Sequence, residues 1–319
     1  MPSNYVLVTG AAGFIGSQLV QQLLNLGRNV IAIDCFLPDL YSSEVKRERW
    51  NAFSDSKENQ LIKHEFDLRT DDFSLLNPYL IDSIFNQAAM PGLSKDWSKF
   101  APYYECNISA LNRLLEYAKT LNLRSFVQAS TSSVYGKIAI GDENQELKPT
   151  SPYGVSKLAA EKLLLAYMES FSTPVKILRY FSVYGPNQRP DMAYSKIIDC
   201  IINEREFTLY GDGEQQRSNT YIDDVIKATL LAESKALHGD IINICGNDTL
   251  SLNESIKIIE ELLGKKMKRK QVERRKGDQK DTSGDNKLAY QRLGWRAEVS
   301  FHEGIQSQVS SAINSISLD

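Results

Sequence analysis

Short apolar runs alternate with amphipathic segments along the first half of the chain. Four of these runs, at residues 5–8, 30–33, 81–85 and 125–129, predict buried strands. Apolar residues at helical spacing predict helices between them, at residues 14–24 and 107–120. Strands that alternate with helices form a parallel sheet covered on both faces. The pattern therefore predicts an α/β fold with a Rossmann-type, doubly wound parallel sheet.

The spacing of turn residues changes after about residue 181, where Gly-Pro, Arg-Pro and Gly-Asp-Gly sequences interrupt the chain. We predict a larger domain at residues 1–181 and a smaller, mainly substrate-binding α/β domain at 182–319. The runs at 220–222 and 240–244 are typical of strands, so the segment of about 218–246 is expected to return to the first sheet. The stretch 265–280 is rich in basic residues and predicts a solvated loop.

Composition excludes several classes of protein. The 319 residues carry 37 basic and 40 acidic side chains, and the net charge of −3 argues against a surface that binds nucleic acid. The four cysteines are far apart without a CxxC pair, which predicts neither a metal site nor a redox motif. No apolar stretch reaches the roughly 18 residues of a membrane span and no leader is evident, so we expect a soluble cytoplasmic protein without membrane contact.

A glycine-rich turn joins the first predicted strand to the first predicted helix. Gly10, Gly13 and Gly16 have GxxGxxG spacing, which lets a backbone approach a pyrophosphate at a helix N-terminus. Asp34 ends the next strand, where a carboxylate accepts a hydrogen bond from a ribose 2′-hydroxyl. An aspartate there repels a 2′-phosphate, and Cys35 follows where an NADP enzyme often has arginine. These features predict a dinucleotide site that binds NAD.

Tyr153 and Lys157 are four residues apart on a predicted helix and therefore share one face. A lysine ammonium beside a phenol favours the phenolate and lowers the tyrosine pKa, which makes the side chain a usable base. The same spacing is also common on solvated helix faces.

Several motifs now follow one another in a fixed order. They are Gly10, Gly13, Gly16, Asp34, Asp67, Leu68, the run 86–89, Thr131, Tyr153 and Lys157. This order resembles the extended short-chain dehydrogenase/reductases, specifically the NAD-dependent sugar-nucleotide epimerase/dehydratase family, over residues 5–295. The resemblance implies a Rossmann domain that holds NAD, a smaller domain that holds a nucleotide-diphosphate sugar, and a homodimer formed through helices that flank the sheet.

The resemblance also implies roles for individual residues. Thr131, Tyr153 and Lys157 would be catalytic. The expected cofactor-binding residues are Gly10, Gly13, Phe14, Ile15, Gly16, Asp34, Asp67, Leu68, Gln87, Ala88, Ala89, Asn107, Tyr153, Lys157 and Tyr180. Asp67 as a turn former and Asn107 as a helix cap are the simpler alternatives.

The residues after the catalytic threonine separate reactions within the family. Dehydratases usually carry Asp-Glu there and UDP-glucuronate decarboxylases a glutamate at the second position, whereas this chain has Ser132 and Ser133. Without that carboxylate, epimerisation at C4 through a 4-keto sugar is the expected reaction. Tyr153 would take the C4-hydroxyl proton while NAD takes the hydride, and both would return to the opposite face.

The run 188–193 is similar to that of UDP-glucuronate 4-epimerases, in which the arginine lies near the C6 carboxylate. The residues expected to bind the UDP-sugar are Ser132, Ser133, Ser182, Arg189, Tyr210, Arg217 and Arg275. Conversion of UDP-glucuronate to UDP-galacturonate is the favoured reaction, although Arg189 in a salt bridge is the simpler reading. The segments 217–221 and 92–95 depart from the usual family sequence and weaken this substrate assignment.

Other functions stay open at this point. A 4-epimerase of a neutral UDP-sugar, such as UDP-glucose/galactose or their N-acetyl forms, is the nearest. A UDP-glucuronate decarboxylase or a net oxidoreductase would use the same Tyr153 and Lys157. A non-catalytic NAD-binding regulator is a third class.

Overall fold

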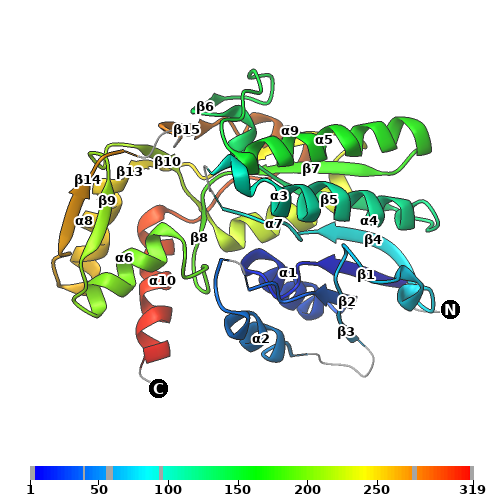
Figure 1. Ribbon diagram of the computed structural model, residues 1–319, viewed down its shortest axis with the longest axis horizontal. Coiled ribbons are helices and arrows are strands. Elements are labelled where there is room, and N and C mark those ends of the chain that lie inside the picture. The colour runs from blue at the N-terminus through cyan, green and yellow to red at the C-terminus, as the bar shows by residue number, and fades with distance from the viewer. Residues whose placement is uncertain (1–3, 39, 55–59, 93–95, 275–278, 317–319) are drawn as a thin grey trace.

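The computed structural model describes residues 4–38, 40–54, 60–92, 96–274 and 279–316. Its main element is a seven-stranded sheet of order β12-β7-β5-β4-β1-β2-β3, in which every neighbouring pair is parallel (Figure 1). The strands are β1 (Asn4–Thr9), β2 (Asn29–Asp34), β3 (Leu61–Glu65), β4 (Leu80–Asn86), β5 (Ser125–Thr131), β7 (Val175–Tyr180) and β12 (Ile241–Ile244). This arrangement confirms the predicted Rossmann-type fold class.

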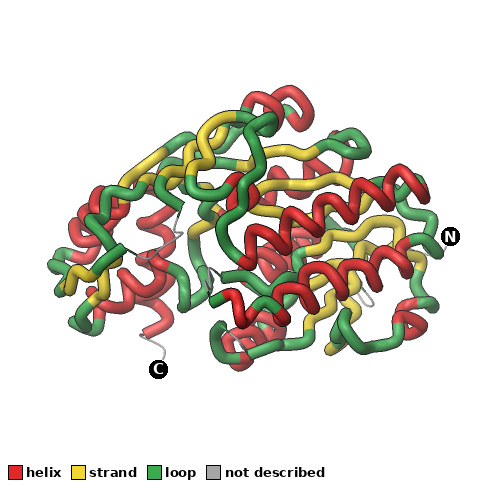
Figure 2. The backbone as a smooth tube through the Cα atoms, turned by 45° about the horizontal axis from the view of Figure 1, so that its top comes forward, coloured by secondary structure: helices red, strands yellow, loops and turns green. Residues whose placement is uncertain are grey.

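Helices cover both faces of this sheet (Figure 2). They include α1 (Phe14–Asn25), α2 (Ser43–Asn51), α3 (Ala101–Tyr104), α4 (Ala110–Ala118), α5 (Pro152–Phe171), α7 (Ile222–Lys235) and α9 (Lys287–Leu293). Shorter turns are the 3-10 helices η1 (Phe73–Leu76), η2 (Trp97–Lys99) and η4 (Ser132–Tyr135), and the π-helix η3 (Glu105–Ser109). In the part of the chain that the structure describes, no helix is long and apolar enough to cross a membrane.

Neighbouring residues of each strand enter two different cores. On β1, Val6 and Val8 pack with α1 and α7, whereas Leu7 packs with α4 and α5. Successive side chains of a strand point to opposite faces, so a strand buried on both faces must be apolar throughout. This explains why the buried strands were visible in the sequence as continuous apolar runs.

The smaller part of the molecule lies beyond the carboxyl ends of the large sheet's strands (Figure 1). Its four-stranded sheet contains β6 (Ile138–Gly141), β10 (Gln216–Ser218), β13 (Thr249–Ser251) and β15 (Asp281–Gly284). Two further pairs are β8 (Val183–Tyr184) with β11 (Thr220–Tyr221), and β9 (Phe207–Tyr210) with β14 (Arg269–Val272). The helices are α6 (Ala193–Ile202), α8 (Leu252–Leu263) and α10 (Phe301–Ile316).

The second half differs from the sequence expectation at two points. Of the two runs expected to return to the first sheet, β12 pairs with β7, but β11 pairs with the two-residue strand β8 instead. The basic stretch predicted as a loop contains β14, which pairs with β9 over four residues. Three of its four side chains, Arg269, Lys270 and Gln271, are polar, so no apolar run marked this strand. The domain limits of 1–181 and 182–319 stay a prediction.

Candidate active site

The carboxyl edge of the large sheet gathers most of the predicted site residues. The glycine turn follows β1, Asp34 ends β2, and Gln87 follows β4. Thr131 and Tyr180 are the last residues of β5 and β7. Ligands of open parallel sheets bind at this edge, so the fold by itself places these side chains where a cofactor would lie.

The glycine turn is packed too closely for any larger residue. Gly10 has a φ of +63°, and a Cβ on it would lie 2.7 Å from the backbone nitrogen of Ala88. A Cβ on Gly16 would lie 2.0 Å from the carbonyl oxygen of Gly10. Gly13 precedes α1, and no described side chain caps this helix end. The first backbone N–H groups of α1 therefore fit a pyrophosphate, as NAD binding requires.

Asp34 is buried and holds both the glycine turn and the turn after β2 in place. Its carboxylate accepts hydrogen bonds from the backbone nitrogens of Ala12, at 3.0 Å, and Phe36, at 2.8 Å. Burial raises the pKa of this carboxyl, and the two backbone donors and the charge of Lys46 lower it. Each oxygen keeps further acceptor capacity, which suits a ribose hydroxyl.

Asp67 and Leu68 lie in the turn after β3. The Asp67 carboxylate is paired with the Arg69 guanidinium at 2.7 Å, and this hydrogen bond holds the pKa of Asp67 below its usual range. It also accepts from the backbone nitrogen of Arg69 at 2.9 Å, as expected of a turn former. The Leu68 carbonyl accepts from Arg113 at 2.7 Å. Their contact with adenine stays a prediction.

Gln87, Ala88 and Tyr180 form a supported loop after β4. The Gln87 side-chain nitrogen donates to the Tyr180 hydroxyl at 3.4 Å, and that hydroxyl bonds Thr229 at 2.8 Å. The Ala88 nitrogen donates to the Thr9 hydroxyl at 3.2 Å. Tyr180 is buried beneath the loop, so in this structure it supports Gln87.

Asn107 is not a helix cap. It lies in the π-helix η3, where its side chain accepts from the Met90 nitrogen at 2.7 Å and donates to the Met90 oxygen at 3.1 Å. One asparagine amide thus replaces the missing backbone partners of Met90. The loop that contains Ala88 and Ala89 is fixed by this contact.

Thr131 and Tyr153 meet at the end of β5. Tyr153 is in the first turn of α5, which begins at Pro152 and is capped by the Ser151 hydroxyl. Burial raises the pKa of the Tyr153 phenol, whereas a hydrogen bond with Thr131 and the charge of Arg189 lower it. The Thr131 hydroxyl thus lies beside the Tyr153 phenol, and their joint contact with a sugar oxygen stays a prediction.

Lys157 lies on the same helix but has a different partner. Its Nζ donates to the carbonyl oxygen of Ala129 at 2.6 Å, and the side chain is only 3% exposed. Burial lowers the Lys157 pKa to about 8, against the charge of Glu161, which raises it. In this structure the ammonium is bonded to β5, and the expected effect of Lys157 on the Tyr153 pKa stays a prediction.

A buried ion pair missed by the sequence analysis lies behind this set. Glu161, one turn after Lys157, bonds the Arg179 guanidinium at 2.8 and 3.0 Å and the Ser130 hydroxyl at 2.5 Å. Arg179 also donates to the Tyr135 hydroxyl at 2.8 Å. The spacing of Glu161 from Lys157 was the only sequence signal for this network.

Arg189 lies at the active site and is already paired. Its Nε and Nη2 donate to the two oxygens of Asp191 at 2.9 and 2.8 Å. Its charge lowers the pKa of both the Tyr153 and the Tyr41 phenol, against burial, which raises both. The salt bridge considered in the sequence analysis is present, and contact between Arg189 and a sugar carboxylate stays a prediction.

The expected serines lie near the same place. Ser132 and Ser133 are buried in η4, directly after Thr131, and Ser182 is half-buried after β7. The Ser133 nitrogen donates to the Thr131 hydroxyl at 3.1 Å. Hydroxyl groups therefore cluster beside the Thr131–Tyr153 pair.

Arg217 holds the end of the basic stretch 265–280. It donates to the carbonyl oxygens of Gln279, at 2.6 Å, and Lys280, at 3.1 Å. The Gln279 side chain in turn donates to the carbonyl oxygens of Ser132, at 3.2 Å, and Gly136, at 3.0 Å. Gln279 thus links Arg217 to the serine turn.

Two expected residues of the nucleotide end stand apart from this link. Tyr210 is half-buried at the end of β9. Arg275 lies outside the described residues. Their contacts with UDP stay a prediction.

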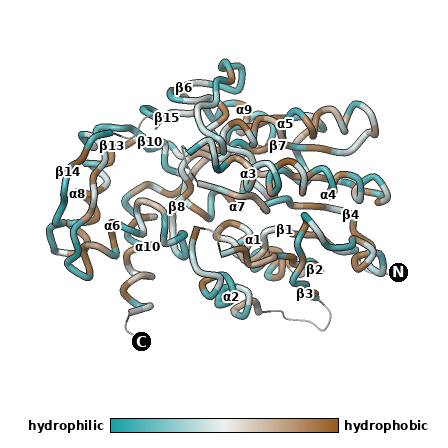
Figure 3. The backbone as a smooth tube through the Cα atoms, in the orientation of Figure 1, coloured by the Kyte–Doolittle hydropathy of each residue, from teal (hydrophilic) through white to brown (hydrophobic). Residues whose placement is uncertain are grey.

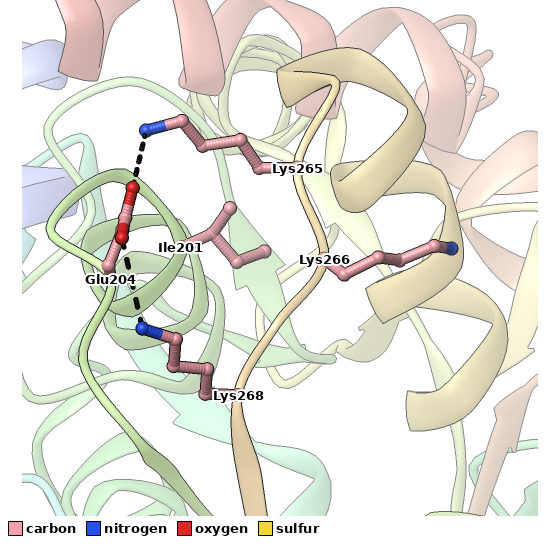
Figure 4. A pocket seen from close by; sticks show the side chains of 5 residues that line it. All are labelled: Ile201, Glu204, Lys265, Lys266 and Lys268. Atoms are coloured by element: carbon pink, nitrogen blue, oxygen red, sulfur yellow. Dashed lines mark hydrogen bonds and ion pairs between the residues drawn. The ribbon is translucent and has the colours of Figure 1, made fainter.

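The basic residues after α8 form a solvated surface. Figure 4 shows a depression where Glu204 lies between Lys265 and Lys268, with Nζ–oxygen distances of 3.5 and 3.8 Å. Lys266 points away and pairs with Glu260 at 2.7 Å. These lysines are exposed and matched by acids, so the depression carries no sign of an anion site.

Comparison with known proteins identifies the family. Residues 6–245 match the sequence profile of the NAD dependent epimerase/dehydratase family. The chain belongs to this family. Membership in the NAD dependent epimerase/dehydratase family confirms the resemblance found in the sequence and the prediction of NAD as cofactor.

Individual members of the epimerase/dehydratase family match over nearly the whole chain. The chain is 40% identical over 310 residues to the uncharacterized UDP-glucose epimerase YtcB of Bacillus subtilis, covering 96% of each. It is 35% identical over 318 residues to the UDP-glucuronate 4-epimerase of Thermodesulfobacterium geofontis, covering 99% of this chain and 98% of the relative. The UDP-glucuronic acid 4-epimerase from Bacillus cereus, solved in complex with UDP-glucuronic acid and NAD, matches with a TM-score of 0.92 at 36% identity, covering 98% and 99% of the two chains.

Proposed function

We propose that the protein is an NAD-dependent UDP-glucuronate 4-epimerase that interconverts UDP-glucuronate and UDP-galacturonate. The observation that carries this proposal is Arg189, whose charge lowers the pKa of the Tyr153 phenol. An arginine beside the proton-transfer group is suited to a sugar with a carboxylate near its reacting carbon. The relatives from Thermodesulfobacterium geofontis and Bacillus cereus support it.

Thr131 at the end of β5 and Tyr153 at the start of α5 have different roles in proton transfer. NAD, when bound, supplies the acceptor for the C4 hydride and later gives the hydride back. Tyr153 takes the C4-hydroxyl proton, and the Thr131 hydroxyl orients the same oxygen. After the 4-keto sugar turns its opposite face to the cofactor site, Tyr153 returns the proton to the C4 oxygen. Lys157 would leave Ala129 for the cofactor's ribose and bring its charge to the phenolate.

Ser132 and Ser133 decide against two other reactions. Neither carries the carboxylate that would protonate a leaving hydroxyl or remove a further proton, so dehydration lacks its acid and base. A 4-keto sugar with a C6 carboxylate loses CO₂ readily unless the carboxylate is held. Arg189 uses Nε and Nη2 for Asp191, so its Nη1 donors and the serine hydroxyls are the groups that would hold the carboxylate.

A 4-epimerase of UDP-glucose is the second candidate. The 40% identity to YtcB of Bacillus subtilis, which is called a UDP-glucose epimerase, favours it. So does the Asp191 carboxylate, which already occupies one edge of Arg189.

A panel of UDP-sugars followed by NMR, without added reductant, separates the two candidates. We expect UDP-glucuronate to give UDP-galacturonate without CO₂ release and without accumulation of NADH. Tyr153→Phe should abolish turnover and keep NAD bound, whereas Tyr167→Phe, on the same helix, should behave as the unmodified enzyme. Turnover of UDP-glucose with no reaction of UDP-glucuronate would replace the first candidate by the second. The homodimer and the cytoplasmic location stay predictions.

A further inference from the structure

The helix α2 packs against the core through one side chain, Trp50. None of its side chains is fully buried, and most of its tube is drawn in hydrophilic colours (Figure 3). With so small an apolar contact, the place of α2 depends also on individual polar contacts. One of these contacts spans 138 residues of sequence, because Arg49 Nη2 donates to the carbonyl oxygen of Asn187 at 2.8 Å.

Asn187 stands two residues before Arg189. Its φ is +63°, a left-handed conformation that asparagine adopts more often than most non-glycine residues. A bond to its carbonyl oxygen holds this turn in place. The Arg49 contact therefore constrains the backbone that leads from Asn187 to Arg189.

The segment before α2, residues 40–42, reaches the same place. Leu40 packs against Gly92, since a Cβ on that glycine would lie 3.3 Å from Leu40 Cδ1. The Tyr103 hydroxyl donates to the carbonyl oxygen of Gly92 at 3.2 Å, and the Tyr103 ring lies 6.4 Å from that of Tyr153. The segment 40–42 thus lies along the active site rather than on a remote surface.

Tyr41 contacts Arg49 directly. Arg49 Nη1 donates to the Tyr41 hydroxyl at 3.4 Å, and the guanidinium lies 5.6 Å from the ring centroid. Burial raises the pKa of Tyr41, and the charges of Arg49 and Arg189 lower it. The charge of Arg189 thus acts on the Tyr41 phenol as it does on the Tyr153 phenol.

We propose that Arg49 and Tyr41 are positioning residues that determine specificity for the sugar carboxylate. Arg49 holds the main chain ahead of Arg189, and Tyr41 lies beside the Arg189 guanidinium, so that this group is presented to the C6 carboxylate. The inference rests on the proposed function, because only a substrate with that carboxylate uses Arg189. Loss of either residue weakens recognition of the carboxylate and leaves proton transfer by Tyr153 intact.

The test compares two ligands that differ only at C6, on the NAD-loaded enzyme. The variants are Arg49→Met, Arg49→Lys and Tyr41→Phe, with Arg47→Met as control. Arg47 is on the same helix but pairs with the exposed Glu65. The measurements are kcat and KM for UDP-glucuronate and the Kd of UDP-glucose, which lacks the carboxylate.

We expect Arg49→Met to raise the KM for UDP-glucuronate about tenfold with kcat within about twofold, as for the loss of one hydrogen bond that positions a charged group. The Kd of UDP-glucose should not change. Arg49→Lys should recover part of the loss, Tyr41→Phe should show a smaller loss of the same kind, and Arg47→Met should show none.

Three results would overturn the inference. Equal weakening of both ligands would mean that α2 acts only on the fold, and an unchanged KM in both Arg49→Met and Tyr41→Phe would mean that neither residue positions Arg189. Lack of UDP-glucuronate turnover by the unmodified enzyme would overturn the proposed function first, and this inference with it. The first two results leave the proposed function in place.

Discussion

Asn107 Nδ2 donates a hydrogen bond of 2.9 Å to Ser156 Oγ and thereby joins the π-helix η3 to the helix of the proton-transfer residues. Ser156 lies between Tyr153 and Lys157, and its hydroxyl donates to the Tyr153 carbonyl oxygen at 2.9 Å. The same asparagine holds both backbone groups of Met90. One amide therefore fixes the loop after β4 relative to the start of α5.

Replacement of Asn107 by alanine should loosen this junction. The Met90 backbone and Ser156 would lose their buried partner, so we expect the free energy of unfolding to fall by roughly 2 kcal/mol and kcat by at least about tenfold. Urea denaturation and steady-state kinetics measure the two effects. Asn203→Ala, which removes only an exposed contact with Asp199, is the control. A folded Asn107→Ala enzyme with normal kcat would refute the expectation.

Two glycines with the same backbone conformation allow the close approach in the cofactor turn to be tested. Gly10 and Gly264 have φ values of +63° and +62°, but a Cβ on Gly264 would meet nothing within 4 Å. Gly264→Ala should therefore lower the free energy of unfolding by only about 1 kcal/mol, because alanine is less stable than glycine in the left-handed conformation. Gly10→Ala should cost more and abolish NAD retention, because its Cβ would collide with Ala88.

Bound NAD in the purified variants and their thermal unfolding provide the measurement. If Gly10→Ala retained NAD at the level of Gly264→Ala, the turn after β1 would not need to approach the loop after β4. The assignment of this turn to the pyrophosphate would then fail as well.

The parts of the site that were predictable from the sequence are those fixed by local backbone geometry. The glycine turn and Asp34 follow directly from a strand and a turn, and Thr131 ends a strand whose apolar run was visible. Their positions depend only on neighbouring residues and on the rule that parallel strands end at one edge. The family resemblance then supplied the roles.

The parts that escaped prediction depend on contacts between distant segments. Arg49 and Asn187 are 138 residues apart, and Gln279 reaches Ser132 across 147. The π-helix that holds Asn107 cannot be distinguished from an ordinary helix by its apolar spacing. Polar residues such as these have no periodic signal, so only the folded chain shows their partners.

The buried ammonium of Lys157 should make stability depend on pH. Burial lowers its pKa from 10.5 to about 8, so between these values the unfolded chain binds a proton that the folded chain does not. Stability therefore rises with pH across this window, by up to about 3 kcal/mol, and the penalty of the buried charge is fully present below pH 8.

The measurement is urea denaturation of the NAD-free protein at several pH values, with Lys157→Met as reference. The unmodified protein should gain stability relative to Lys157→Met as the pH rises from about 8 to 10.5. Lys162→Met removes an exposed lysine from the same helix and should follow the unmodified protein. If the free energy of unfolding changed with pH in the same way in the unmodified protein and in Lys157→Met, burial of the Lys157 ammonium would not destabilise the fold.

Removal of Arg189 should affect both substrate binding and the fate of the 4-keto sugar. A hydrogen bond to a charged group contributes roughly 2 kcal/mol, so Arg189→Ala should raise the KM for UDP-glucuronate about thirtyfold.

The same variant should also allow loss of CO₂ from the 4-keto sugar. Once the carboxylate is no longer held, the 4-keto sugar can rotate until the bond between C5 and the carboxylate carbon has the orientation from which CO₂ is released. We therefore expect a measurable yield of CO₂ together with a UDP-4-ketopentose, and one NADH left on the enzyme for each ketopentose that is released without being reduced. Arg205→Ala, which removes an exposed arginine paired with Asp199, should release none. An Arg189→Ala enzyme with normal KM and no CO₂ would show that another group binds the carboxylate and that the assignment of UDP-glucuronate must rest on other residues.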